Sequence, residues 1–114
     1  MKEVDGRVVR GRGRGQVLGF PTANLELADP LPNGIYAGSV WAEGKEYPAA
    51  FFIGRGQKIL EAHLIGFHGD LYGRAIRAAL GKKIRDVQSY DSDETLISAI
   101  KKDVGEALRI YRFP

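Results

Sequence analysis

A helical repeat of apolar residues occurs in this chain only toward its C-terminal end, and that limits the folds it can adopt. From about Ser92 to Arg112, apolar residues recur every three or four positions, while lysine, glutamate and arginine occupy the other face. Asp91 or Ser92 can cap the start, and Glu94 stands at capping-box spacing after Asp91. The pattern predicts one amphipathic helix that packs against the rest of the protein.

The residues before this helix have the pattern of short strands separated by turns. Apolar or alternating segments are bounded by Gly, Pro, Asn and Asp, and a Glu43-Gly44 turn joins two of them into a hairpin. The strands are expected at residues 4–10, 22–27, 35–42, 45–53, 58–67 and 72–84. Because strands and helices do not alternate, the sequence argues against a doubly wound sheet and predicts an antiparallel β-barrel carrying one helix.

Composition narrows the chemistry. With 114 residues, 44% of them apolar, the chain is expected to form one domain over residues 1–114. It has no cysteine and two histidines, so any metal is expected to be a hard cation held by oxygen atoms. The first residues lack the apolar core of a signal peptide and no membrane span is present, which predicts a cytoplasmic protein without a membrane partner. A net charge of +3 suits anionic ligands but falls short of the basic stripe typical of nucleic-acid-binding proteins.

The segment from Arg10 to Asn24 has the sequence RGRGRGQVLGFPTAN. Its alternating glycines and arginines offer flexible backbone amides and positive charge, which a polyphosphate requires. No Rossmann G-x-G-x-x-G fingerprint can be written through these glycines, and no Gly-Lys-Ser or Gly-Lys-Thr of a P-loop closes them. We expect a loop over residues 11–19 that contacts phosphate, with a solvated surface loop as the alternative.

The end of this segment supplies oxygen ligands. Phe20-Pro21 forces an extended bend, because proline fixes its own backbone and restricts the residue before it. The hydroxyl of Thr22 and the amide oxygen of Asn24 are hard ligands compatible with magnesium. The alternative is that both side chains only hydrogen-bond the bend itself.

A second candidate group lies in the sequence LEAHL at residues 60–64. In a strand, Leu60, Ala62 and Leu64 share one face, so Glu61 and His63 project together from the other. A carboxylate there can act as the general base that accepts a hydroxyl proton during phosphoryl transfer. The alternatives are that Glu61 is an exposed strand carboxylate and that His63 packs or supports a neighbouring group.

These motifs, in their order along the chain, resemble the riboflavin kinase (flavokinase) family, including the kinase module of bifunctional riboflavin kinase/FAD synthetases. The resemblance extends from Gly6 to about Leu108. It is carried by VVRGRGRG at 8–15, LGFPTAN at 18–24, PNGIY at 32–36, LEAHL at 60–64, DLYG at 70–73, Ile84-Arg85, and Ser92 to Leu96 with Ile100 and Asp103. Seven separated motifs in this order are far more specific than one glycine loop.

The resemblance implies a mainly β fold, a six-stranded antiparallel barrel of Greek-key-like connectivity with one C-terminal α-helix. It also implies magnesium-dependent transfer of the terminal phosphoryl group of ATP to the ribityl hydroxyl of riboflavin, which gives FMN and ADP. In the family the threonine and asparagine of the Pro-Thr-Ala-Asn motif bind magnesium and the phosphates, and these are Thr22 and Asn24 here. The family's catalytic glutamate corresponds to Glu61.

The remaining roles are also transferred from the family. The glycine segment is expected to contact ATP and its phosphates through Gly11, Gly13, Arg14, Gly15 and Gly19. Riboflavin is expected to contact Tyr72, Arg85, Tyr90 and Leu96. The expected ligands are riboflavin or FMN and ATP or ADP, with no nucleic acid, bound to a monomer.

The sequence departs from the family in one loop. Related kinases carry a longer loop with an Arg-Pro-Thr-Phe-like sequence before the glutamate, whereas only residues 55–60 stand between Gly54 and Glu61 here. This departure favours a second hypothesis, a non-catalytic flavin- or nucleotide-binding or regulatory module on the same barrel. A barrel-type nucleic-acid-binding protein is a third hypothesis. The His-x-Gly-His motif of a nucleotidyltransferase is absent from the sequence, so we expect FMN and not FAD as the product.

Overall fold

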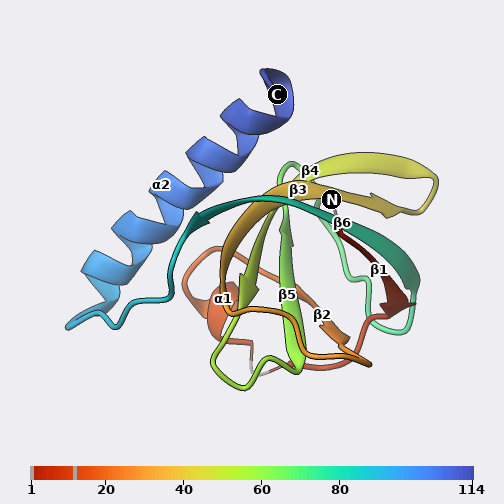
Figure 1. The fold of residues 1–114 in the computed structure, drawn as a ribbon, viewed down its shortest axis with the longest axis horizontal. Coiled ribbons are helices and arrows are strands. Elements are labelled where there is room, and N and C mark those ends of the chain that lie inside the picture. The colour runs from red at the N-terminus through yellow and green to blue at the C-terminus, as the bar shows by residue number, and fades with distance from the viewer. Residues whose placement is uncertain (1, 12) are drawn as a thin grey trace.

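The computed structural model describes residues 2–11 and 13–114, and for Arg14 it describes the backbone. The elements along the chain are β1 (Lys2–Arg7), α1 (Arg14–Val17), β2 (Ala23–Glu26), β3 (Gly34–Ala42), β4 (Lys45–Ile53), β5 (Ile59–Leu64), β6 (Ala75–Arg85) and α2 (Asp93–Arg112). Figure 1 shows the strands wrapped into a barrel, with α2 beside it.

The six strands form one antiparallel sheet in the order β1-β6-β3-β4-β5-β2. Strands β3, β4 and β5 follow one another, and β6 returns to pair with β3, which is the Greek-key order. A bridge between Val9 and Asn24 joins the two edges of the sheet, so that the barrel is nearly closed. The predicted fold class, a six-stranded antiparallel Greek-key barrel with one C-terminal helix, is confirmed.

The barrel interior is filled by alternate residues of each strand. In β5, Leu60, Ala62 and Leu64 are buried and the residues between them are partly exposed. This is the alternation of side chains between the two faces of a strand that the sequence predicts. Opposite them, Ala23 and Leu25 of β2 are also buried. Removal of this apolar surface from water is the main favourable contribution to folding.

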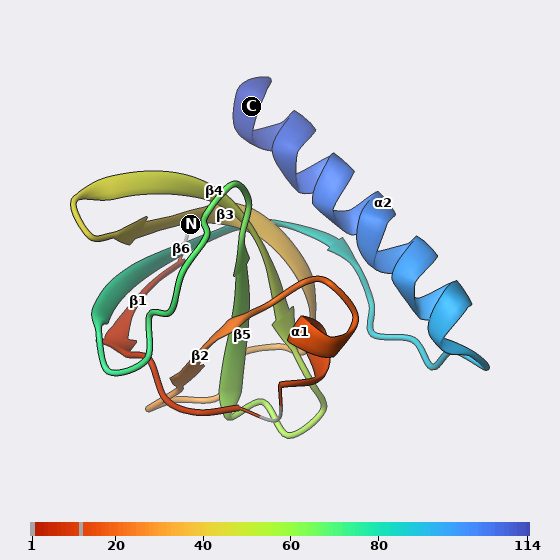
Figure 2. The ribbon, with the colours of Figure 1, turned by 180° about the vertical axis from the view of Figure 1, so that it is seen from behind.

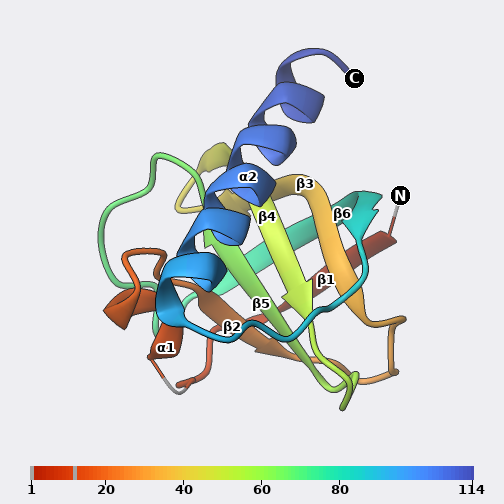
Figure 3. The same cartoon turned by 90° about the vertical axis from the view of Figure 1, so that its left-hand side faces the viewer.

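Helix α2 begins and ends close to the predicted residues. Ser92 is the N-cap, and it forms a capping box with Thr95, whose backbone N–H donates to the Ser92 hydroxyl at 3.2 Å. The predicted pairing of Asp91 with Glu94 is wrong, because the helix begins one residue later than that pairing requires. Figure 3 shows α2 lying across the barrel over β3 and β4.

Two other local predictions need correction. The segment predicted as irregular over residues 11–19 contains the short helix α1, closed by a 3.1 Å hydrogen bond from Val17 N–H to Gly13 O. The last strand begins at Ala75 and not at Tyr72, because Leu71 to Arg74 form a turn in which Arg74 N–H donates to Leu71 O. Within the described part of the chain, no helix combines the length and apolar character needed to cross a bilayer.

Candidate active site

A cavity of about 780 Å³ lies on the side of the barrel that carries both helices. Four parts of the chain line it: the segment from Gly13 to Asn24, Ile35 of β3, strands β4 and β5 with the loop between them, and the segment from Arg85 to Val104. Figure 2 shows α1 and α2 on this same side of the barrel. The cavity therefore brings together both groups of residues that the sequence singled out.

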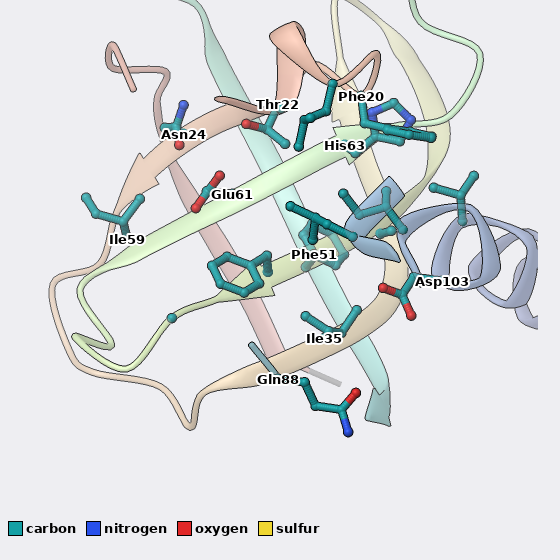
Figure 4. A pocket seen from close by; sticks show the side chains of 18 of the residues that line it. Phe20, Thr22, Asn24, Ile35, Phe51, Ile59, Glu61, His63, Gln88 and Asp103 are labelled. Atoms are coloured by element: carbon teal, nitrogen blue, oxygen red, sulfur yellow. The ribbon is translucent and has the colours of Figure 1, made fainter. Parts of the chain in front are cut away.

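Asn24 and Glu61 are direct neighbours in the sheet. Strand β2 pairs with β5 so that Asn24 lies opposite Glu61, between the buried pairs Ala23–Ala62 and Leu25–Leu60. Directly opposed residues of an antiparallel pair have their Cβ atoms roughly 5 Å apart on one face. Both side chains line the cavity, as does Thr22 just before the strand. Figure 4 shows the oxygen atoms of Thr22, Asn24 and Glu61 presented to one region of it.

The bend before β2 is held by His63 of β5. The ring Nδ1 of His63 lies 2.8 Å from the backbone oxygen of Pro21, and the His63 and Phe20 rings meet edge to face at 5.6 Å. The backbone N–H of Phe20 donates to Gly15 O at 2.6 Å, which ties the bend to α1. The bend carrying Thr22 is thus attached both to the strand of Glu61 and to the glycine segment.

Two glycines allow close approach to the site. A Cβ atom added to Gly11 would lie 2.3 Å from the side-chain nitrogen of Asn24, and one added to Gly15 would lie 2.4 Å from the backbone oxygen of Phe20. Both distances are far below ordinary van der Waals contact, so no larger side chain fits without movement. These glycines therefore let the segment pack directly against Asn24 and the bend.

The donor atoms at this end of the cavity fit a hard divalent cation. The Thr22 hydroxyl, the Asn24 amide oxygen and the Glu61 carboxylate all line the cavity, and oxygen is the ligand type that magnesium prefers. Among the described residues, no three His, Cys, Asp or Glu side chains gather in a way that could hold a metal by themselves. A cation here would take its remaining ligands from phosphate oxygens and water.

The opposite wall is built on an ion pair between β6 and α2. Arg85 donates two hydrogen bonds to Asp103, Nε to Oδ1 at 2.9 Å and NH2 to Oδ2 at 2.7 Å. The hydrogen bond to Asp103 raises the pKa of Arg85. Asp103 is only 5% exposed, and the Arg85 guanidinium also lies 5.7 Å from the Tyr90 ring. The pair fixes α2 against the barrel at the cavity.

Most of the residues expected to bind ligands lie around this cavity. It is lined by Gly13, Gly15, Thr22, Asn24, Glu61, Arg85, Tyr90 and Leu96. Of the other described candidates, Gly11 packs behind Asn24, and Gly19 and Tyr72 are absent from the lining. Tyr72 is half exposed, with the Arg10 guanidinium 4.0 Å from its ring centre. The Arg14 side chain and all of Arg12 lie outside the described residues.

Sequence reasoning missed several lining residues. The structure adds Phe52 from β4 and Ile59 from β5, which have partly exposed apolar side chains, and Gln88 and Asp103 from the far wall. Asp103 could have been found from its spacing, because it stands three residues after Ile100 and four before Ala107 on the apolar face of the helix. A carboxylate at such a position requires a buried partner.

Three comparisons relate the chain to known proteins. The family model described as "Flavokinase: Riboflavin kinase" matches residues 2–111. Bifunctional riboflavin kinase/FMN adenylyltransferases from Mycoplasma pneumoniae and Pseudomonas fluorescens are each 38% identical to it, over 94% and 91% of this chain and 42% and 36% of theirs. A solved structure, riboflavin kinase from Trypanosoma brucei, matches with a TM-score of 0.74 and 26% identity over 100% of this chain and 84% of its own. The chain thus spans about two fifths of the length of these two curated relatives.

Proposed function

This chain belongs to the riboflavin kinase family, and we propose that it transfers the terminal phosphoryl group of ATP to the ribityl hydroxyl of riboflavin, giving FMN and ADP. The observation that carries the proposal is the pairing of Asn24 with Glu61 across β2 and β5, with Thr22 beside them at one cavity. A catalytic carboxylate and two neutral oxygen donors on adjoining positions match the needs of phosphoryl transfer, which are alignment, charge neutralisation and a base.

In this reaction Glu61 is the general base. Its carboxylate accepts the proton of the ribityl hydroxyl as that oxygen attacks the terminal phosphorus of ATP. The new bond joins the ribityl oxygen to phosphorus, and the bond between this phosphorus and the bridging oxygen of ADP breaks. Glu61 holds its proton until it is released to water, and ADP leaves with the electron pair of the broken bond.

The polar end of the cavity is assigned to the phosphates. Thr22 and Asn24 would hold a magnesium ion, which when bound neutralises charge on the phosphate oxygens. Gly13 and Gly15 line the same end, where their backbones leave room for a phosphate chain.

The wall toward α2 is assigned to the flavin. The apolar lining of this wall comes from Ile35 of β3 and from Leu96, Ile100 and Val104 of α2, with the ring of Tyr90 beside them. An apolar wall interrupted by a few polar groups such as Gln88 suits a planar aromatic ring system with polar edges. The two ends therefore differ in the chemistry that they can bind.

The test is product formation with matched variants. The protein is incubated with riboflavin, magnesium and each nucleoside triphosphate in turn, and FMN is separated and quantified by its fluorescence. Glu61→Gln is expected to lower the rate by about 10²–10⁴-fold with little change in the unfolding midpoint, because the amide keeps the size of the side chain but cannot act as the base. Thr22→Ala is expected to raise the magnesium concentration needed for half-maximal rate.

The same assay also tests a second function, that of a non-catalytic binding or regulatory module. The short loop between Gly54 and Glu61 favours a binding or regulatory module, since it removes family residues next to the site. If the protein binds riboflavin but makes no FMN with any triphosphate, the kinase proposal is wrong and the binding module is supported.

A further inference from the structure

The proposed mechanism assigns no role to His63, although its side chain lines the cavity two residues from Glu61. We propose that His63 is a positioning residue: its ring donates a hydrogen bond to the Pro21 backbone oxygen and so holds Thr22 in place relative to Glu61. This inference rests on the proposed function for its catalytic consequence, but its structural content can be tested separately.

The direction of the hydrogen bond follows from the chemistry of the two groups. A backbone carbonyl oxygen can only accept, so the 2.8 Å contact between Nδ1 and Pro21 O requires a proton on Nδ1. In neutral His63 the other ring nitrogen, Nε2, is then unprotonated. The geometry therefore specifies one tautomer of the imidazole.

The bend needs this bond because the sheet ends before it. The ladder between β2 and β5 begins at the pair Ala23–Ala62, so Pro21 and Thr22 lie beyond its last backbone pair. The His63 side chain extends the connection between the two segments past that point. The edge-to-face contact of its ring with Phe20 adds a second attachment to the same bend.

The consequence should appear at the phosphate end of the cavity. Thr22 directly follows the held carbonyl, whereas the apolar lining assigned to riboflavin comes from other segments of the chain, mainly α2. Releasing the bend should therefore weaken the use of magnesium-ATP and leave riboflavin binding nearly unchanged. A residue needed only for the stability of the barrel would not separate the two substrates in this way.

The variants follow from the donor geometry. His63→Phe keeps a ring for the contact with Phe20 but removes the donor, whereas His63→Asn places an amide N–H near the position of Nδ1. His68→Phe is the matched control, because His68 is exposed and is not part of the cavity lining among the described residues. Urea unfolding of each variant measures any loss of stability.

We expect His63→Phe to lower kcat/KM for ATP roughly tenfold, the effect of losing one hydrogen bond at the site. KM for riboflavin should change by less than about twofold, and His63→Asn should recover most of the loss, on the same hydrogen-bond argument. His68→Phe should match the unaltered protein. Equal losses in the Phe and Asn variants, no loss in the Phe variant, or equal effects on both substrates would each overturn the positioning role.

A spectroscopic measurement separates this inference from the proposed function. In the His68→Phe protein, long-range ¹⁵N–¹H spectra report on His63 alone, since the chain has two histidines. The neutral ring should show a protonated Nδ1 and an unprotonated Nε2, and the opposite tautomer refutes the hydrogen bond. If the unaltered protein makes no FMN, the proposed function fails, and this tautomer still decides whether His63 holds the bend.

Discussion

Breaking the ion pair between Arg85 and Asp103 should destabilise the protein by an amount that depends on which partner is removed. The Asp103 side chain is 6% exposed and that of Arg85 is 24% exposed. A charge left without its partner costs more when it is more deeply buried. Arg85→Met leaves the buried carboxylate, whereas Asp103→Leu leaves a guanidinium that still reaches water and donates to Asp86 O at 3.1 Å.

The expected free-energy changes follow from these environments. Loss of one partner of a buried pair costs roughly 3–5 kcal/mol, and partial exposure of Arg85 places this pair at the lower end. We therefore expect about 3 kcal/mol for Arg85→Met and about 2 kcal/mol for Asp103→Leu. The double variant leaves no unpaired charge, so its cost should be about 2 kcal/mol less than the sum of the two single costs.

Urea unfolding followed by circular dichroism measures these differences. With a slope of about 1.5 kcal/mol/M, typical of a domain of this size, Arg85→Met should lower the midpoint by about 2 M. Asp103→Leu should lower it by about 1.3 M on the same basis. Additive costs would refute coupling between the two residues. A larger cost for Asp103→Leu than for Arg85→Met would refute the argument from burial.

Three further outcomes are expected. Gly11→Ala should lower kcat/KM for ATP at least tenfold, because the added Cβ would lie 2.3 Å from the Asn24 amide nitrogen, and it should leave riboflavin affinity unchanged. Steady-state kinetics with each substrate measure this, and equal effects on both substrates would contradict the prediction. Gly105→Ala is the matched control in α2, where an added Cβ meets nothing within 4 Å; it should keep activity and raise the free energy of unfolding by about 1 kcal/mol. The hydrogen bond that Tyr111 donates to Glu46 raises the pKa of Tyr111, so the stabilisation is present below about pH 10 and is lost as pH rises through the higher folded-state value. The ultraviolet titration of Tyr111→Phe should lose amplitude from its latest phase, and a loss from the earlier phase instead would exclude this bond.

The parts of the fold that the sequence predicted are those governed by local periodicity. The alternation of Leu60, Ala62 and Leu64 correctly predicts that these three residues of β5 are buried and that the residues between them face outward. Helix α2 could also be predicted from the sequence, because the spacing of its apolar residues and the cap at Ser92 both act within a few residues. Such patterns need no knowledge of which strands are neighbours.

Helix α1 shows why other features escaped. Gly15 lies within it, and glycine disfavours helix by about 1 kcal/mol relative to alanine, so local propensity argues against this turn. Its hydrogen bond from Phe20 N–H to Gly15 O and its contact with the bend are tertiary interactions. The stack of Arg10 on Tyr72 is a similar case, since it depends on how two distant segments meet and no local pattern predicts it.

The pairing of Asn24 with Glu61 depends on strand register, and the register is set by the barrel core. Leu25 opposite Leu60 and Ala23 opposite Ala62 face inward, so the residues between them must face outward together. A shift of β2 by one residue would move Asn24 into the apolar interior, and the cost of burying its unpaired amide opposes that shift. Strand β2 has only four residues, so its few backbone hydrogen bonds specify its register weakly. The cost of burying the Asn24 amide therefore helps to fix the register. The apolar residues that stabilise the barrel are therefore also the ones that align the polar atoms of the proposed phosphoryl-transfer site.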